Sequence, residues 1–464
     1  MRVAVVAVVI VVLSGGRVTA QPVISELTEI VEPAAPTRAS YAPVTPISRS
    51  YIIPAIEVVV LDILAHLGAR AAGVSWAEVT PSTIATNLTH AWVYDEDVFA
   101  VNQFAHPYGG SGMFLAARSS GLGFWTSSAY AFAGSLLWET LMESEPPSIN
   151  DQITTPIAGA LLGEALHRWG RAVRMGGGAH PSIGRRVLSA LIDPMGTTNR
   201  AMFGDRWRKV PPPEVHAHMG AGWNQALVTD ARSPVHLELA VSHGFPSDER
   251  FVPRVPLDHF DLRAQLDFGT DDIAGFVNLR GLVVGSVFGP PRRRALWGLY
   301  GTYDYWNPDY ARASAVGVGP GITAHAAIGA RGFAEAVLVL TLVPFGAAGG
   351  AGDGGGPQRD YHHGPGLGQL LELKLGLRDV GLLKLGARAI EIDGTLVGDA
   401  TEAVVVTTLG GLVQVAPHHA IGVELVYAAR GARFEATQDT AFDQASQLRV
   451  MYAITSDGAF GGGR

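Results

Sequence analysis

The chain contains no cysteine among its 464 residues. This absence excludes a disulfide-stapled scaffold, a lipid anchor on an N-terminal cysteine and a zinc site built on thiolates. Charged residues are also scarce, at 16% of the chain against about 25% in typical soluble proteins. Glycine (57 residues) and hydrophobic residues (47%) are abundant instead. This composition favours a protein that faces lipid over a soluble enzyme.

Positive charge is too thinly spread for a nucleic-acid partner. The formal net charge is −8, and no basic run is long enough to neutralise a series of phosphates. The chain also lacks a glycine-rich phosphate loop, a nucleophile elbow and a dinucleotide fingerprint in the right strand-to-helix context. We therefore predict no nucleic acid and no cofactor.

The first twenty residues have the features of a secretory signal peptide. Arg2 supplies the positive start, residues 3–13 form an unbroken apolar run, and Val18-Thr19-Ala20 offers small residues for cleavage. Because a membrane-spanning helix needs about 20 apolar residues, an uncleaved anchor is the weaker alternative. Residues 21–50, rich in proline, are predicted to be an extended linker.

Residues 51–230 are predicted to form a domain of about four helices with a connecting segment. The first three helices are expected at 52–71, 97–119 and 124–143. For the fourth, Thr155 is the expected cap, Pro156 the first helical residue, and the glycines from Gly176 the end. The third helix is apolar enough to leave an inner-membrane span open as an alternative.

After residue 230 the hydrophobic period changes from 3.6 to 2. Apolar and polar residues alternate without error at 260–268, and similar alternation recurs at 235–242, 371–378, 421–427 and 448–454. Alternating segments of about ten residues joined by turns are typical of a membrane barrel. We predict an α+β protein in which an antiparallel transmembrane β-barrel of about 12 strands occupies 231–464. A soluble β-sandwich is the alternative.

The apolar helices retain ten polar residues that need an explanation, since an unpaired buried charge is costly. They are Asn102, His106, Arg118, Glu139, Ser148, Asn150, Asp151, Glu164, His167 and Arg168. Glu164 and His167 form a Glu-x-x-His pair on one helix face, a spacing that contributes ligands in helical-bundle metal sites. Together with His106 and Glu139, they are candidate ligands of a metal ion.

Structural roles explain most of the same residues equally simply. Glu164 and Arg168 have the spacing of an i,i+4 ion pair, and Glu139 is placed to pair with Arg118. Ser148 and Asp151 resemble a capping box. Ion pairing is therefore the favoured interpretation, ahead of a metal or catalytic site and of lipid or ligand binding.

One pattern of residues resembles an uncharacterised bacterial family, a domain of unknown function in which a helical segment precedes an outer-membrane barrel. It reads Asn102…His106-Pro107…Gly112…Arg118…Trp138-Glu139…Pro147-Ser148-x-Asn150-Asp151…Gly159…Gly163-Glu164…His167-Arg168. The resemblance covers roughly residues 95–205. It implies a location in the cell envelope and no established activity.

Three functions remain open. The favoured one is an outer-membrane barrel of a Gram-negative-type bacterium, plugged or capped by its helical domain and passing or handling a small molecule or lipid. The others are a membrane enzyme acting on lipid or envelope substrates through His106, Glu139, Glu164 and His167, and an envelope scaffold. The expected partners are outer-membrane lipids, the barrel-assembly machinery and a small-molecule or lipid ligand.

Overall fold

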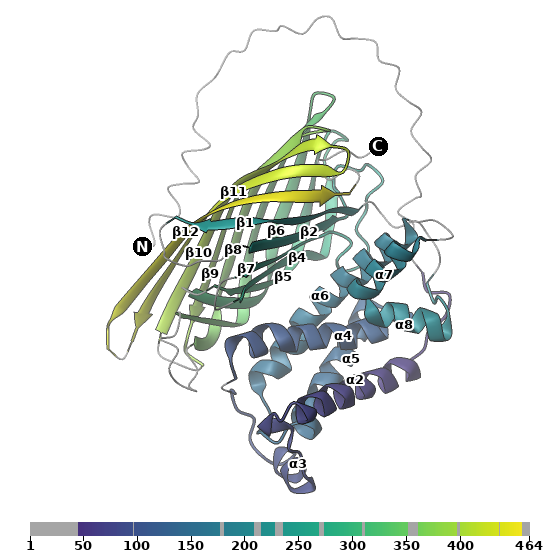
Figure 1. Cartoon of the computed structure of the whole chain (residues 1–464), viewed down its shortest axis with the longest axis vertical. Helices are drawn as coiled ribbons and strands as arrows, with labels where there is room; N and C mark the ends of the chain where they lie inside the picture. Colours follow the sequence, from purple (N-terminus) through teal and green to yellow (C-terminus); the bar gives the residue numbers. More distant parts are fainter. Residues whose placement is uncertain are drawn as a thin grey trace, which may run out of the picture. The chain divides into compact units, whose positions relative to one another are not determined.

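The computed structural model describes residues 45–95, 97–176, 181–207, 215–227, 235–268, 273–308, 311–350, 361–396, 400–435 and 437–456. In this part of the chain helices come first and a β-barrel follows (Figure 1), which confirms the expected α+β class. The predicted signal peptide at 1–20 and most of the predicted linker at 21–50 lie outside the described residues.

Seven α-helices, not about four, precede the barrel in the described residues. They are α2 (Ile52–Ala71), α3 (Pro81–Asn87), α4 (His106–Ser119), α5 (Phe124–Leu137), α6 (Ile149–Met175), α7 (Ile183–Ile192) and α8 (Pro194–Phe203). Two π-helical turns, Val101–Ala105 and Trp138–Met142, lie just before α4 and just after α5. Helices α3, α7 and α8 span 7, 10 and 10 residues. They are too short for a hydrophobic period to reveal them.

The start predicted for α6 is wrong. The helix begins at Ile149, because the Ser148 hydroxyl caps it by accepting a hydrogen bond of 3.2 Å from the Asp151 backbone N–H. The capping pattern of Ser148 and Asp151 is thereby confirmed, and Pro156 lies inside the helix. A proline in a helix interior removes one backbone hydrogen bond. The buried faces of α6 on both sides of Pro156 show that packing outweighs this loss.

Helices α4 and α6 approach closely through glycines. A Cβ atom at Gly110 would lie 2.0 Å from the Thr155 carbonyl oxygen, and one at Gly159 would lie 2.6 Å from the Gly110 carbonyl carbon. Phe114, Leu161 and Leu162 pack in the core around this contact. The pair of glycines therefore sets the separation of the two central helices.

Twelve antiparallel strands close into a barrel, with β1 paired to β12. They are β1 (Val215–Ala226), β2 (Val235–His243), β3 (Phe260–Phe268), β4 (Ile273–Phe288), β5 (Arg293–Asn307), β6 (Ala311–Ile328), β7 (Gly332–Gly350), β8 (Tyr361–Leu377), β9 (Gly381–Asp393), β10 (Ala400–Ala416), β11 (His419–Phe434) and β12 (Thr440–Thr455). The strand number agrees with the sequence-based expectation, and closure distinguishes the fold from a sandwich. The barrel begins at Val215, before position 231, because β1 carries glycine, histidine and asparagine on one face and so lacks a strong apolar signal.

Ion pairs across the barrel show which side chains point into the lumen. Asp304 on β5 contacts Arg388 on β9, and these strands are not neighbours in the sheet. Both side chains must therefore point inward, and Tyr303 and Tyr305 beside Asp304 must point outward. On β11 the outward residues Ile421, Val423 and Leu425 are exposed, whereas the intervening Glu424 is buried. On this strand the outer face is apolar and the face toward the lumen is polar.

The helical domain contacts the outer wall of the barrel. The outward-facing Tyr303 donates a hydrogen bond of 2.6 Å to the carbonyl of Gln103, just before α4. Tyr361 likewise donates to the carbonyl of Asp97 at 2.7 Å. The Tyr361 side chain also points outward. The next residue, His362, points inward because it reaches Glu402 on the non-adjacent strand β10, and successive side chains of a strand face opposite sides. These contacts do not support the expectation that the helices plug the lumen.

We expect Gly159→Ala to destabilise the helical domain by about 1–3 kcal/mol, because the added methyl group would overlap the α4 backbone. Thermal unfolding of the detergent-folded protein, followed by circular dichroism at the helical band, measures this. The matched control is Gly109→Ala, where a Cβ meets nothing within 4 Å and the helix gains a better helix former. Equal melting of the two variants would contradict the close helix contact.

Candidate functional site

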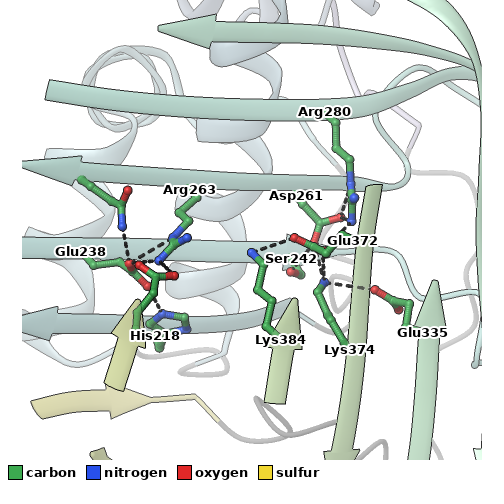
Figure 2. Close-up of polar contacts among 12 residues, drawn as sticks. His218, Glu238, Ser242, Asp261, Arg263, Arg280, Glu335, Glu372, Lys374 and Lys384 are labelled. Carbon is green, nitrogen blue, oxygen red and sulfur yellow. Dashed lines mark hydrogen bonds and ion pairs between the residues drawn. The ribbon is translucent and has the colours of Figure 1, made fainter. Parts of the chain in front are cut away.

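Charged side chains from distant strands meet inside the barrel (Figure 2). In a first group, the Arg263 guanidinium on β3 lies 2.5 Å from a Glu238 oxygen and 2.7 Å from a Glu424 oxygen. His218 approaches the second Glu238 oxygen at 2.7 Å. Arg449 on β12 joins the same group through Glu424, at 3.3 Å. The group therefore connects the neighbouring strands β3, β2, β1, β12 and β11 across the β1–β12 closure.

A second group lies beside the first and has the same character (Figure 2). Arg280 approaches Asp261 at 2.6 Å. Glu372 lies 3.0 Å from Lys374 and 2.7 Å from Lys384. Arg280 also lies 3.5 Å from Glu372, and Lys374 lies 3.7 Å from Asp261, so the second group bridges from β3 and β4 to the distant strand β8.

The side chains of these ion pairs are buried inside the barrel. Arg280 and Arg449 are each only 2% exposed, although they project into the interior of a barrel. Apolar side chains are also buried inside it, including Phe276 and Trp306 from β4 and β5. Sequence alternation identifies these strand residues as one polar face but does not reveal their pairing partners. The arrangement links side chains of several strands inside the barrel.

The polar residues of the helices divide into two separate groups. The first, here called the ion-pair cluster, consists of Arg118, Glu164, Arg168 and Asp258. The Glu164 carboxylate accepts hydrogen bonds from Arg118 at 2.6 and 3.1 Å and from Arg168 at 2.8 Å. Arg168 in turn donates to Asp258, in the loop before β3, at 2.9 Å. Burial opposes ionisation, but the two arginines outweigh it and hold the pKa of Glu164 below its ordinary value.

His167 lies close to this cluster but faces another partner. Its Nδ1 is 3.2 Å from Asp193, which also caps α8. Burial and the surrounding arginines hold the pKa of His167 well below its ordinary value, so the ring is neutral. Trp207 packs against the ion-pair cluster. Its ring centroid lies 4.3 Å from the Arg118 guanidinium, and its Nε1–H donates a hydrogen bond to the Arg118 carbonyl.

The second group, here called the acidic cluster, consists of Asp95, His106, Glu139 and Asp151. Asp95 accepts hydrogen bonds from the side-chain amides of Asn102 and Asn150. Asn102 also donates to the Tyr361 hydroxyl on β8, at 2.9 Å. The acidic cluster therefore lies where the helical domain meets the outer wall of the barrel.

Three donors of this cluster face one another. One ligand atom each from His106, Glu139 and Asp151 lies within 4.8 Å of the other two. Burial first, and then the neighbouring Glu143 carboxylate, raise the pKa of Glu139 to about 9. Burial and the adjacent Asp95 likewise raise the pKa of Asp151 well above its ordinary value. These carboxyl groups are the described residues best placed to hold a metal ion.

The structure therefore rearranges the sequence-predicted ligand set. His106 and Glu139 do lie together, but Asp151 is their third partner, and Glu164 and His167 belong to the other group. The predicted pairing of Glu139 with Arg118 is wrong, because Glu139 instead accepts a hydrogen bond of 2.8 Å from the Ser148 backbone N–H. The i,i+4 pair of Glu164 and Arg168 is confirmed. Spacing along one helix could not reveal Asp95, which comes from a loop.

Residues 91–195 match the family model described as a domain of unknown function (DUF3943). The match confirms the resemblance seen in the sequence. It includes the helical members of both polar groups and ends before the barrel. No curated protein matches the sequence.

Solved structures similar to the chain include porins and channels. Among them are the NanC porin (6% identity, 51% of this chain and 98% of that one, TM-score 0.29) and the CymD monoaromatic hydrocarbon channel (11%, 53% and 88%, TM-score 0.23). The outer-membrane channel DcaP of Acinetobacter baumannii is similar over 52% of this chain and 96% of its own, with 9% identity and a TM-score of 0.23. At these TM-scores the likeness implies no transport activity for this chain.

We expect Glu164→Gln to destabilise the helical domain by about 3–5 kcal/mol, because it leaves buried guanidinium groups without their shared carboxylate. Chemical unfolding followed by circular dichroism measures the change. Glu145→Gln, the same substitution at an exposed glutamate nearby, should leave the unfolding free energy nearly unchanged. A small effect at Glu164 would show that the ion-pair cluster is not what stabilises this contact.

Because buried ion pairs occupy the lumen, we expect the purified protein to give no steady conductance in planar lipid bilayers. We expect a double variant, Arg263→Ala with Arg280→Ala, to produce measurable conductance, because it removes the central cation of each lumen group. The matched control is Arg250→Ala, which removes an exposed arginine outside the strands. A large steady conductance of the unaltered protein would contradict closure.

Proposed function

We propose that this protein is an outer-membrane β-barrel that binds or handles membrane lipid at the outside of its wall, with the lumen serving as a closed support. The observation that carries the proposal is the position of the helical domain, which contacts outward-facing barrel residues. A domain placed there meets lipid and not a solute in the pore.

The outer surface of the barrel has the composition that lipid contact requires. Leu338, Leu340 and Leu342 follow one another on the outward face of β7, and all three are exposed. Leu409 and Val413 are exposed on β10 in the same way. Soluble monomers rarely expose apolar patches of more than a few hundred Å². This belt supports a bilayer around the strands.

Part of the same outer surface is covered by helices instead of lipid. Near the start of β5 the outward-facing Trp297 and Leu299 are exposed, whereas Tyr303 and Tyr305 further along it are buried. These tyrosines share one apolar core with Leu161 of α6 and Phe99. The helical domain therefore adjoins the lipid-facing belt on a single continuous wall.

Helix α2 presents an apolar stripe on its free side. Its exposed side chains recur at helical spacing and are Ile52, Ile56, Val59, Val60, Ile63, Leu64 and Leu67. The opposite side, with Pro54, Val58 and Asp62, is buried against the domain. This helix is also the one described helix that is long and apolar enough to cross a membrane. A helix on a water-facing surface turns its apolar side to the core and its polar side to water, whereas α2 leaves its apolar side exposed.

Contact with lipid would remove this stripe from water. Burial of a fully exposed Leu or Ile side chain contributes roughly 1.5–3 kcal/mol, so several such residues together are enough to hold a domain against a bilayer. The apolar residues Trp125 and Phe132 on α5 are exposed as well. We infer that these helices lie in the lipid interface beside the barrel.

The proposed location requires export and assembly. The signal-like segment at 1–20 supports passage to the periplasm, and insertion of a closed barrel would involve the barrel-assembly machinery. The surrounding lipids are then the permanent partners. An envelope scaffold uses the same architecture without a lipid ligand, and it is the main alternative.

A polarity-sensitive fluorophore on Leu64→Cys tests lipid contact of the helical domain. Because the chain has no native cysteine, labelling is confined to the introduced residue. In proteoliposomes containing nitroxide-labelled lipids, we expect strong quenching of this label, since Leu64 lies in the exposed stripe of α2.

Two further labelled positions serve as the lipid-facing and water-facing references. Leu409→Cys on the outward face of β10 should be quenched as a lipid-facing reference, and Ser82→Cys on the polar, exposed α3 should remain unquenched. If the Leu64→Cys label behaves like the one on α3, the helical domain faces water and the proposal fails.

A further inference from the structure

We propose that His106, Glu139 and Asp151 form a binding site for one divalent first-row transition-metal ion. The proposal goes beyond lipid handling and does not depend on it. It rests on the geometry, burial and charge of the acidic cluster.

Three separate elements bring the donors together. His106 is the first residue of α4, Glu139 lies in the π-helical turn after α5, and Asp151 lies in the first turn of α6. Their ligand atoms lie within 4.8 Å of one another. Donors about 2.1 Å from a tetrahedral ion are about 3.4 Å apart, so modest side-chain rotation would complete the coordination.

Buried oxygen atoms at this place lack hydrogen-bond donors. Glu139 and Asp151 are each 1% exposed. Yet Glu139 Oε1 and Asp151 Oδ1 have no hydrogen-bond partner among the described residues. Buried polar atoms in folded proteins are nearly always satisfied. A cation bound between these two carboxyl groups would satisfy both oxygens together.

The surrounding charges also favour a cation. The acidic residues Glu143, Asp95 and Asp97 act on the Glu139 carboxyl, which also accepts a hydrogen bond from the Ser148 backbone N–H. Asp95 and Glu139 act on Asp151, whose side chain also interacts with Ser148. Glu164, in contrast, has two arginine partners in the same domain. Carboxyl groups placed this close to one another without an arginine or lysine partner favour a bound cation.

The donor types indicate the class of ion. Imidazole nitrogen suits zinc and other transition ions, whereas carboxylate and amide oxygens suit harder ions such as manganese. His106 offers one imidazole nitrogen, and Glu139 and Asp151 offer carboxylate oxygens. One nitrogen with two carboxylates therefore favours Zn²⁺ or Mn²⁺ over Ca²⁺, which prefers six or more oxygens.

Two π-helical turns border the site. One, Val101–Ala105, contains Asn102 and leads directly into His106, and the other, Trp138–Met142, contains Glu139. Such turns are rare and occur frequently at functional sites. Here each of them sets the direction of a donor side chain.

The test is equilibrium dialysis of the full chain, folded in detergent, against Zn²⁺ and separately Mn²⁺, followed by elemental mass spectrometry. We expect one tightly held ion per chain, and a loss of affinity of at least about tenfold in Glu139→Gln and in Asp151→Asn.

Both substitutions preserve the local hydrogen bonds. Glutamine at 139 keeps an oxygen for the Ser148 N–H, and asparagine at 151 keeps a donor for Asp95. Glu143→Gln removes the same charge from a neighbour outside the donor set and should retain the ion. Circular dichroism and the heat-dependent gel mobility of each variant report folding.

Two results would overturn the proposal. In the first, the unaltered protein retains neither ion. In the second, folded Glu139→Gln and Asp151→Asn retain it as well as the unaltered chain, which would assign the ion to other histidines such as His362 or His418. Loss of lipid contact by the Leu64→Cys label would leave this metal test unaffected, so the two proposals fail independently.

Discussion

Closure of the backbone hydrogen-bond network is the constraint on which the rest of this structure depends. In a bilayer an unpaired strand edge is too costly to persist, so a membrane sheet must close on itself. Pairing of β1 with β12 achieves this. Once the sheet is closed, alternate side chains must face either lipid or the lumen. The apolar Leu409 outside and the paired Arg263 inside are direct consequences.

The wall also determines where the helical domain lies. Tyr303, Tyr305 and Leu262 point outward and would meet lipid, but they pack with Phe114 and Leu161 in one core. The helices thus substitute for lipid over one region of the barrel. This explains why α2 has an exposed apolar stripe rather than a polar outer face. In the lipid contact proposed above, the bilayer would cover this stripe.

Within that domain, two buried glutamates show how neighbours decide the role of a residue. Glu164 is matched by Arg118 and Arg168, so its charge is neutralised and its task is to connect α4, α6 and the loop before β3. Glu139 is equally buried but faces Asp151 and His106. The first arrangement is complete within the protein, whereas the second gains from a ligand that supplies positive charge.

Several features follow from the sequence alone. The 2-residue alternation predicts the barrel and its approximate strand number, and the apolar run at 52–71 predicts α2 with its observed ends, because both signals are local. The domain match at 91–195 likewise follows from the spacing of residues such as His106 and Glu164. The attachment of the helices to the outer wall, the partners of the lumen charges and the union of His106 with Asp151 were decided only by tertiary structure. Each depends on contacts between residues far apart in the chain, which local period and spacing do not encode.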